Sequence, residues 1–148
     1  MMKMFKIDIV KEKIDGVDYD GRKNLNSSQL AYDVLKDIYS QWSDDKERVL
    51  AIPLDSKNKP LGVDLVSIGT VNTALMHPRE VFRKAIIAGA NSVIVSHNHP
   101  SGDPSPSRED IDMTERLKSA GTILGIRLLD HIIIGDQAFV SLAELNII

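Results

Sequence analysis

The stretch from Ser96 to Asp110 constrains what this chain can fold into more than any other part of it. A short apolar run, Ser92-Val93-Ile94-Val95, precedes it and is typical of a strand buried on both faces. Alternate side chains of a strand point to the same side. We therefore expect His97 and His99 to share one face, so that the end of this strand presents two imidazoles to a single cation.

The residues after the histidines predict a loop and then a helix. Prolines at positions 100, 104 and 106, with a glycine at 102, exclude a helix interior. Ser107 has the character of an N-cap, which places Asp110 in the first helical turn. Two imidazoles and one carboxylate form a zinc ligand set whose fourth position is open to water, as in catalytic sites. Ser-x-x-Asp is also a common helix cap, and capping and ligation can coexist.

This combination resembles the signature of the JAMM (MPN-plus) metallohydrolases, with the spacing His97-x-His99-x7-Ser107-x2-Asp110. Residues 97–104 and 106–110 are similar in particular to the RadC-like branch of that superfamily. Two further strings resemble the same branch: His-Pro-Arg-Glu-Val-Phe at residues 77–82 and Asp-His-Ile-Ile-Ile-Gly at residues 130–135.

The resemblance covers Asn26 to Ile148 and implies one RadC-like JAB/MPN domain over residues 26–148. Residues 1–25 are expected to form a strand, at residues 4–10, and a polar arm. Members of the family usually carry a helix-hairpin-helix region before this domain. The chain resembles a short form without it, so a DNA-repair role would rest on the family name alone.

The resemblance also implies an activity and roles for individual residues. It implies a zinc-dependent hydrolase of amide bonds, a peptidase or isopeptidase acting on a peptide or protein substrate. In the family a glutamate at the start of an early strand is the general base, and the serine of the motif hydrogen-bonds the oxyanion. Ser107 fits the second role. Glu47, which heads a predicted strand, is the expected base, with Glu80, at the start of a predicted helix, as the alternative.

Other interpretations compete with the hydrolase. The chain could be a non-catalytic interaction module that keeps an inherited fold, although its complete motif argues against this. A zinc deaminase would need a Pro-Cys-x-x-Cys motif, and the chain has no cysteine. His77 is expected to cap or pack, and His131, inside an apolar run, to be a hydrogen-bonded core histidine.

The order of elements predicts a single α/β domain with a mixed β-sheet flanked by about three helices. The resemblance implies the same architecture, related in outline to cytidine deaminases. Pro53 indicates an edge strand or a strand end. Helices are predicted over residues 26–42, 77–89 and 108–120, with Gly121 ending the third, and strands over 4–10, 47–54, 61–70, 126–134 and 139–141 beside the strand that carries the histidines.

Composition bounds the remaining possibilities. A chain of 148 residues suits one domain, and neither a signal peptide nor an apolar run of membrane-spanning length is visible. The lack of cysteine agrees with a reducing cytoplasm. The net charge is −3 and no segment is rich in lysine and arginine, so strong direct binding to nucleic acid is not expected. Neither the substrate nor the oligomeric state follows from the sequence.

Overall fold

A computed structural model of the chain describes residues 1–14, 17, 23–69 and 76–148. It contains a single α/β domain with a mixed sheet, as the sequence predicts. None of the helices described is long and apolar enough to cross a bilayer. The helices are α1 (Ser28–Tyr39), α2 (Pro78–Ile87) and α3 (Arg108–Leu124), and the strands are β1 (Glu47–Leu54), β2 (Asp64–Gly69), β3 (Ser92–Asn98), β4 (Arg127–Ile134) and β5 (Phe139–Ser141).

The five strands form one sheet in the order β2-β1-β3-β4-β5. β1 pairs antiparallel with both β2 and β3, whereas β3 and β4 are parallel and are connected through α3. β1 and β2 form the predicted hairpin, although residue 70 of its predicted second arm lies outside the described residues. Pro53 lies near the end of β1, beyond the last residue paired with β2, so its missing N–H costs no bond to that strand.

Helices cover both faces of the sheet. α1 lies on one face, where its Leu35 and Ile38 join an apolar cluster with Ile52, Ile94 and Ile132 of the strands. α2 and α3 lie on the other face and contribute Phe82 and Leu117, among others, to a second cluster. Each fully buried Leu, Ile or Phe stabilises the fold by about 1.5–3 kcal/mol relative to exposure. The central strands β1 and β3 are therefore buried on both faces, which explains why they read as continuous apolar runs.

Two helix ends differ from the sequence-based prediction. α1 ends at Tyr39, a little before the predicted Trp42. α3 continues past Gly121 to Leu124, and Gly125, with φ of 70°, provides the left-handed cap. Residue 121 lies inside the helix and has to be glycine, because a Cβ there would lie 2.4 Å from the carbonyl oxygen of Ile126. That glycine permits close packing of α3 on the start of β4 and does not end the helix.

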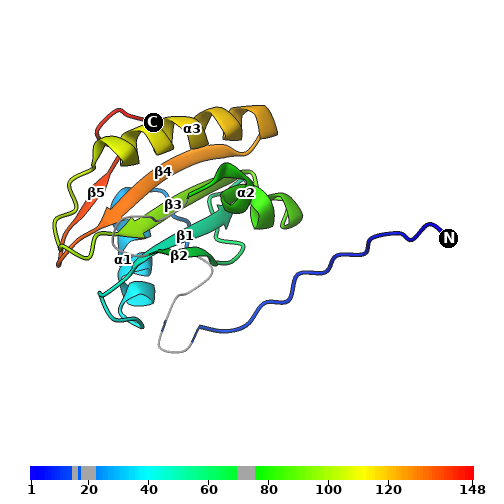
Figure 1. The fold of residues 1–148 in the computed structure, drawn as a ribbon, viewed down its shortest axis with the longest axis horizontal. Helices are drawn as coiled ribbons and strands as arrows, with labels where there is room; N and C mark the ends of the chain where they lie inside the picture. The colour runs from blue at the N-terminus through cyan, green and yellow to red at the C-terminus, as the bar shows by residue number, and fades with distance from the viewer. Residues whose placement is uncertain (15–16, 18–22, 70–75) are drawn as a thin grey trace.

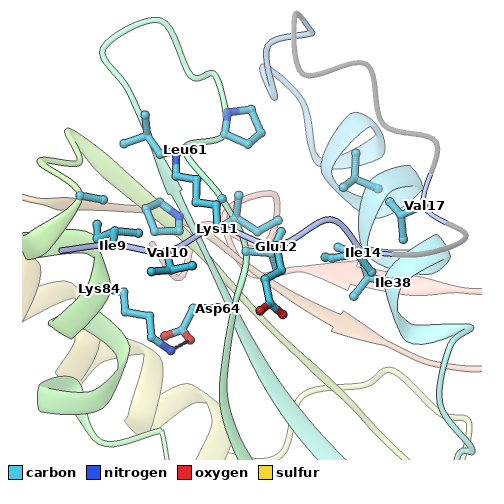
Figure 2. A pocket seen from close by; sticks show the side chains of 17 residues that line it. Ile9, Val10, Lys11, Glu12, Ile14, Val17, Ile38, Leu61, Asp64 and Lys84 are labelled. Atoms are coloured by element: carbon cyan, nitrogen blue, oxygen red, sulfur yellow. Dashed lines mark hydrogen bonds and ion pairs between the residues drawn. The ribbon is translucent and has the colours of Figure 1, made fainter.

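The predicted strand over residues 4–10 is absent from the sheet. Residues 1–14 are exposed and form neither helix nor strand, and the N-terminal end of this segment extends away from the domain (Figure 1). Residues 15–16 and 18–22 of the predicted polar arm that follows lie outside the described residues. Residues 9–12 border a cavity of about 430 Å³ together with α1, α2 and the β1–β2 connection (Figure 2). The alternating pattern of this segment is real, but it has no neighbouring strand among the described residues.

Candidate metal centre

The end of β3 carries the two histidines of the motif. His97 lies in the strand and is fully buried, whereas His99 follows the strand and is partly exposed. Their Nε2 atoms lie 2.9 Å apart. The alternation expected from the sequence therefore brings both rings together, and Asn98 between them instead accepts a hydrogen bond from the Arg48 N–H.

Asp110 reaches the same point from the first turn of α3. Its Oδ1 lies 3.2 Å from Nε2 of His97, and its Oδ2 lies 3.2 Å from Nε2 of His99. A capping box fixes this carboxylate, because Ser107 Oγ accepts from the Asp110 N–H and Asp110 Oδ2 accepts from the Ser107 N–H. Capping and convergence on the histidines coexist in the same two residues.

The pKa of Asp110 reflects these contacts. Burial alone would raise it, but the adjacent imidazoles of His97 and His99, together with the hydrogen bond from the Ser107 N–H, hold the pKa of the carboxyl well below its usual range. The adjacent Asp110 carboxylate likewise raises the pKa of His99, against the opposing effect of burial. Asp110 is therefore a carboxylate at neutral pH.

The pattern of donors and acceptors suits a cation. His99 Nδ1 lies 2.8 Å from the carbonyl oxygen of Asp103, which can only accept, so Nδ1 carries the hydrogen. In the neutral ring, Nε2 then directs a lone pair at Asp110, another acceptor. In tetrahedral zinc sites bond lengths of about 2.0–2.1 Å separate ligand atoms by about 3.3 Å. The observed separations of 2.9 and 3.2 Å are close to that value, so these residues fit a zinc ion.

Glu47, the first residue of β1, lies beside the histidines. β1 and β3 are antiparallel with Val49 opposite His97, so the start of β1 meets the end of β3. Glu47 Oε1 is 3.7 Å from Nε2 of His97. Burial raises the pKa of Glu47, and the nearby His97 and His99 partly oppose that effect. Glu47, His97 and His99 have ligand atoms within 4.8 Å of one another and could bind a metal ion.

Glu80 is in a different environment. It lies in the first turn of α2, where its carboxylate pairs with Arg79 at 3.5 Å and Arg83 at 3.7 Å. It is not part of the group that could hold a metal. His77 is the N-cap of the same helix and accepts from the Arg79 N–H, as the sequence predicts. The structure thus brings Glu47 to the histidines and keeps Glu80 with its own helix.

Sequence reasoning missed one residue next to the site. His131 of β4 is fully buried and hydrogen-bonded, as predicted for a core histidine, but its partner is His97: Nε2 of His131 lies 2.7 Å from Nδ1 of His97. The parallel register pairs His131 with Val95, which lies on the same face as His97. A βαβ reading of β3, α3 and β4 could have indicated this contact, but local pattern alone could not.

The loop between His99 and Asp110 is held against the turn that follows β4. Gly102 accepts a hydrogen bond from the Asp136 N–H, and a Cβ on Gly135 would lie 2.4 Å from the Gly102 carbonyl oxygen. The absence of a side chain at position 135 therefore permits this close approach. The same loop and His99 border a cavity of about 430 Å³ that extends to α1.

Fold and site together define an α/β domain with a candidate metal centre where β1, β3 and α3 meet. A family model described as the RadC-like JAB domain matches residues 25–147, and the chain belongs to that family.

The relatives are similar over most of the chain. A UPF0758 protein of Desulfitobacterium hafniense is 51% identical over 136 residues, which cover 86% of this chain and 60% of the relative. One from Geobacillus sp. is 48% identical over 89% of this chain and 58% of its own length. One from Methanococcoides burtonii is 46% identical, over 84% and 54% respectively. The chain thus spans little more than half the length of these relatives.

Proposed function

We propose that this chain is a zinc-dependent metallohydrolase of the JAMM type that cleaves amide bonds in a peptide or protein, as a peptidase or isopeptidase. His97, His99 and Asp110 hold the zinc in this proposal. The observation that carries it is the convergence of two imidazole Nε2 atoms and a carboxylate, at 2.9–3.2 Å, with a second carboxylate alongside. A binding module that had lost its chemistry would have no need for this set.

Zinc bound there would supply activation of water, whose pKa it lowers from 15.7 toward about 7. Glu47 is the base that takes the proton, because it is adjacent to His97 and burial raises its pKa. A positioned base contributes typically about 10²- to 10⁴-fold to the rate. Glu80 is the weaker candidate for this role, since it is paired with two arginines on its own helix.

Ser107 stabilises the oxyanion that forms at the amide carbon. As the N-cap of α3 it uses a lone pair of Oγ to accept from the Asp110 N–H. A hydroxyl can accept and donate at once, so capping leaves its hydrogen for a substrate oxygen. The side chain is exposed, as a group that contacts substrate must be.

The decisive experiment is elemental analysis of the purified chain, followed by assays on peptides and isopeptide-linked proteins with and without a chelator. We expect one equivalent of zinc and cleavage that the chelator abolishes and zinc restores. The double variant His97→Ala, His99→Ala provides the metal-free control. A full equivalent of zinc in that variant would show that the site is wrongly assigned, and zinc without any cleavage would favour the interaction module instead.

A further inference from the structure

His131 and Thr114 form a buried chain of hydrogen bonds behind the candidate metal centre. His97 Nδ1 lies 2.7 Å from His131 Nε2. His131 Nδ1 lies 2.6 Å from Thr114 Oγ1, which lies 2.6 Å from the carbonyl oxygen of Asp110. His97, Thr114 and His131 are all completely buried. The chain thus starts at one proposed ligand and ends at the backbone of another.

The last link of the chain decides the direction of every other link. The Asp110 carbonyl can only accept, so Thr114 donates its single hydroxyl hydrogen to it. Thr114 Oγ1 must then accept from His131, which places the His131 hydrogen on Nδ1. A neutral His131 has a lone pair left on Nε2, and this accepts from Nδ1–H of His97.

The consequence for His97 is a single tautomer. With its hydrogen on Nδ1, the lone pair of His97 lies on Nε2, the nitrogen that faces His99 and Asp110. This is the form that binds a metal through Nε2. The opposite tautomer of His97 would direct an N–H at the metal position. It would also require the hydrogen of His131 on Nε2, so that His131 Nδ1 and Thr114 Oγ1 would face each other as two acceptors. Complete burial supports the assignment, because taking a charged imidazolium out of water is costly and favours the neutral ring.

We propose that His131 and Thr114 are positioning residues that fix the tautomer and ring orientation of His97 for metal binding. The inference rests on the proposed function, because it concerns the same metal site. It goes beyond that function in giving a role to a buried pair that touches neither metal nor substrate. The alternative is that His131 is merely a hydrogen-bonded core residue, in which case its loss would lower stability and leave metal affinity unchanged.

The test is the zinc dissociation constant, measured by chelator competition, for paired variants at His131 and Thr114. His131→Leu and Thr114→Val remove the hydrogen bonds at similar volume, whereas His131→Gln and Thr114→Ser keep an acceptor and a hydroxyl. Loss of such an outer partner typically weakens metal binding about 10- to 100-fold. We expect a loss of that size in His131→Leu, a smaller one in Thr114→Val, and partial or full recovery in His131→Gln and Thr114→Ser.

The control is Ser141→Ala. Ser141 is buried and its Oγ donates to Asp130, outside the chain of hydrogen bonds, so this variant is expected to lose stability but not zinc affinity. Nitrogen-15 NMR of the histidine rings gives an independent measurement, and we expect Nδ1–H on both His97 and His131 in the zinc-loaded protein. If the wild-type protein bound no zinc, both the proposed function and this inference would be overturned. Wild-type zinc binding that His131→Leu leaves unchanged would overturn the inference alone.

Discussion

The first turns of α2 and α3 are built alike and are used differently. α2 starts with a His77 cap and has Glu80 in its first turn, and α3 starts with a Ser107 cap and has Asp110 in its first turn. Both carboxylates lie at the positive end of a helix dipole. Glu80 pairs with arginines of its own helix, whereas Asp110 contacts two histidines of β3.

The difference lies in what precedes each helix. α3 follows β3 through a loop of residues 99–107, so its first turn is brought back over the strand end that carries the histidines. α2 follows β2 and has no histidine pair to meet. The same local signal therefore stabilises one helix and, in the other, also brings a carboxylate to two histidines. Substitutions made in pairs at the two helix starts separate these roles.

The largest difference is expected between Asp110→Asn and Glu80→Gln. Asp110→Asn keeps an oxygen that accepts from the Ser107 N–H but removes the negative charge that favours a bound zinc ion. We therefore expect zinc affinity to fall more than about 100-fold, which exceeds the usual loss when a residue that only hydrogen-bonds a metal ligand is removed. The Glu80→Gln variant should retain a full equivalent of zinc. Elemental analysis after dialysis measures both, and equal zinc contents would remove the distinction between the helices.

Glu47→Gln tests the proposed base at the start of β1, beside His97. The amide cannot take a proton, so we expect zinc to be retained and turnover to fall by about 10²- to 10⁴-fold. Glu80→Gln is again the matched control. Should Glu47→Gln remain fully active while Glu80→Gln binds metal and is inactive, the two glutamates exchange roles.

Ser107→Ala and Ser27→Ala compare two serine N-caps. Ser27 caps α1 through the Leu30 N–H, so either substitution is expected to destabilise the fold by about 0.5–2 kcal/mol. Only Ser107→Ala should also lower turnover, by about 10²- to 10³-fold, the usual cost of one oxyanion donor. Urea unfolding and steady-state kinetics on both variants measure the two effects. Equal turnover in the two variants would limit Ser107 to capping.

The smallest effect is expected from Glu80→Gln on stability. A carboxylate in an exposed first helical turn contributes about 0.3–1 kcal/mol at low salt. Glu80 is 41% exposed, so we expect a loss at the lower end of that range, and high salt should remove it. Urea unfolding in low and high salt measures the change. A loss that salt leaves unchanged would mean that Glu80 acts through packing instead of charge.

The fold and the candidate site were predictable to different extents. The mixed sheet, the β1–β2 hairpin and three helices follow from periodicity and turn residues, and the structure confirms them. His97, His99, Ser107 and Asp110 could be singled out because they lie close together in the sequence. The role of each remains a prediction, although the structure brings them together with Glu47.

Features that depend on contacts distant in sequence were missed. Gly121 looks like a helix stop, but only the approach of Ile126 and Phe82 shows why a glycine is needed inside α3. The contact of His131 with His97 depends on the register of two parallel strands, which no local pattern contains. Alternation of apolar and polar residues, as at residues 4–10, leads to a strand only where a neighbouring strand is available to pair with it.

The close approach of Gly135 to the Gly102 carbonyl makes the geometry of the candidate site depend on a residue that is not itself a proposed ligand. Any side chain there would push the Gly102 carbonyl, and with it the loop that connects His99 to Asp110. A random screen for inactive variants should therefore recover substitutions at Gly135 alongside those at the proposed ligands His97, His99 and Asp110. Such variants would be folded and would carry every chemical group of the site, yet they would hold those groups at the wrong separation.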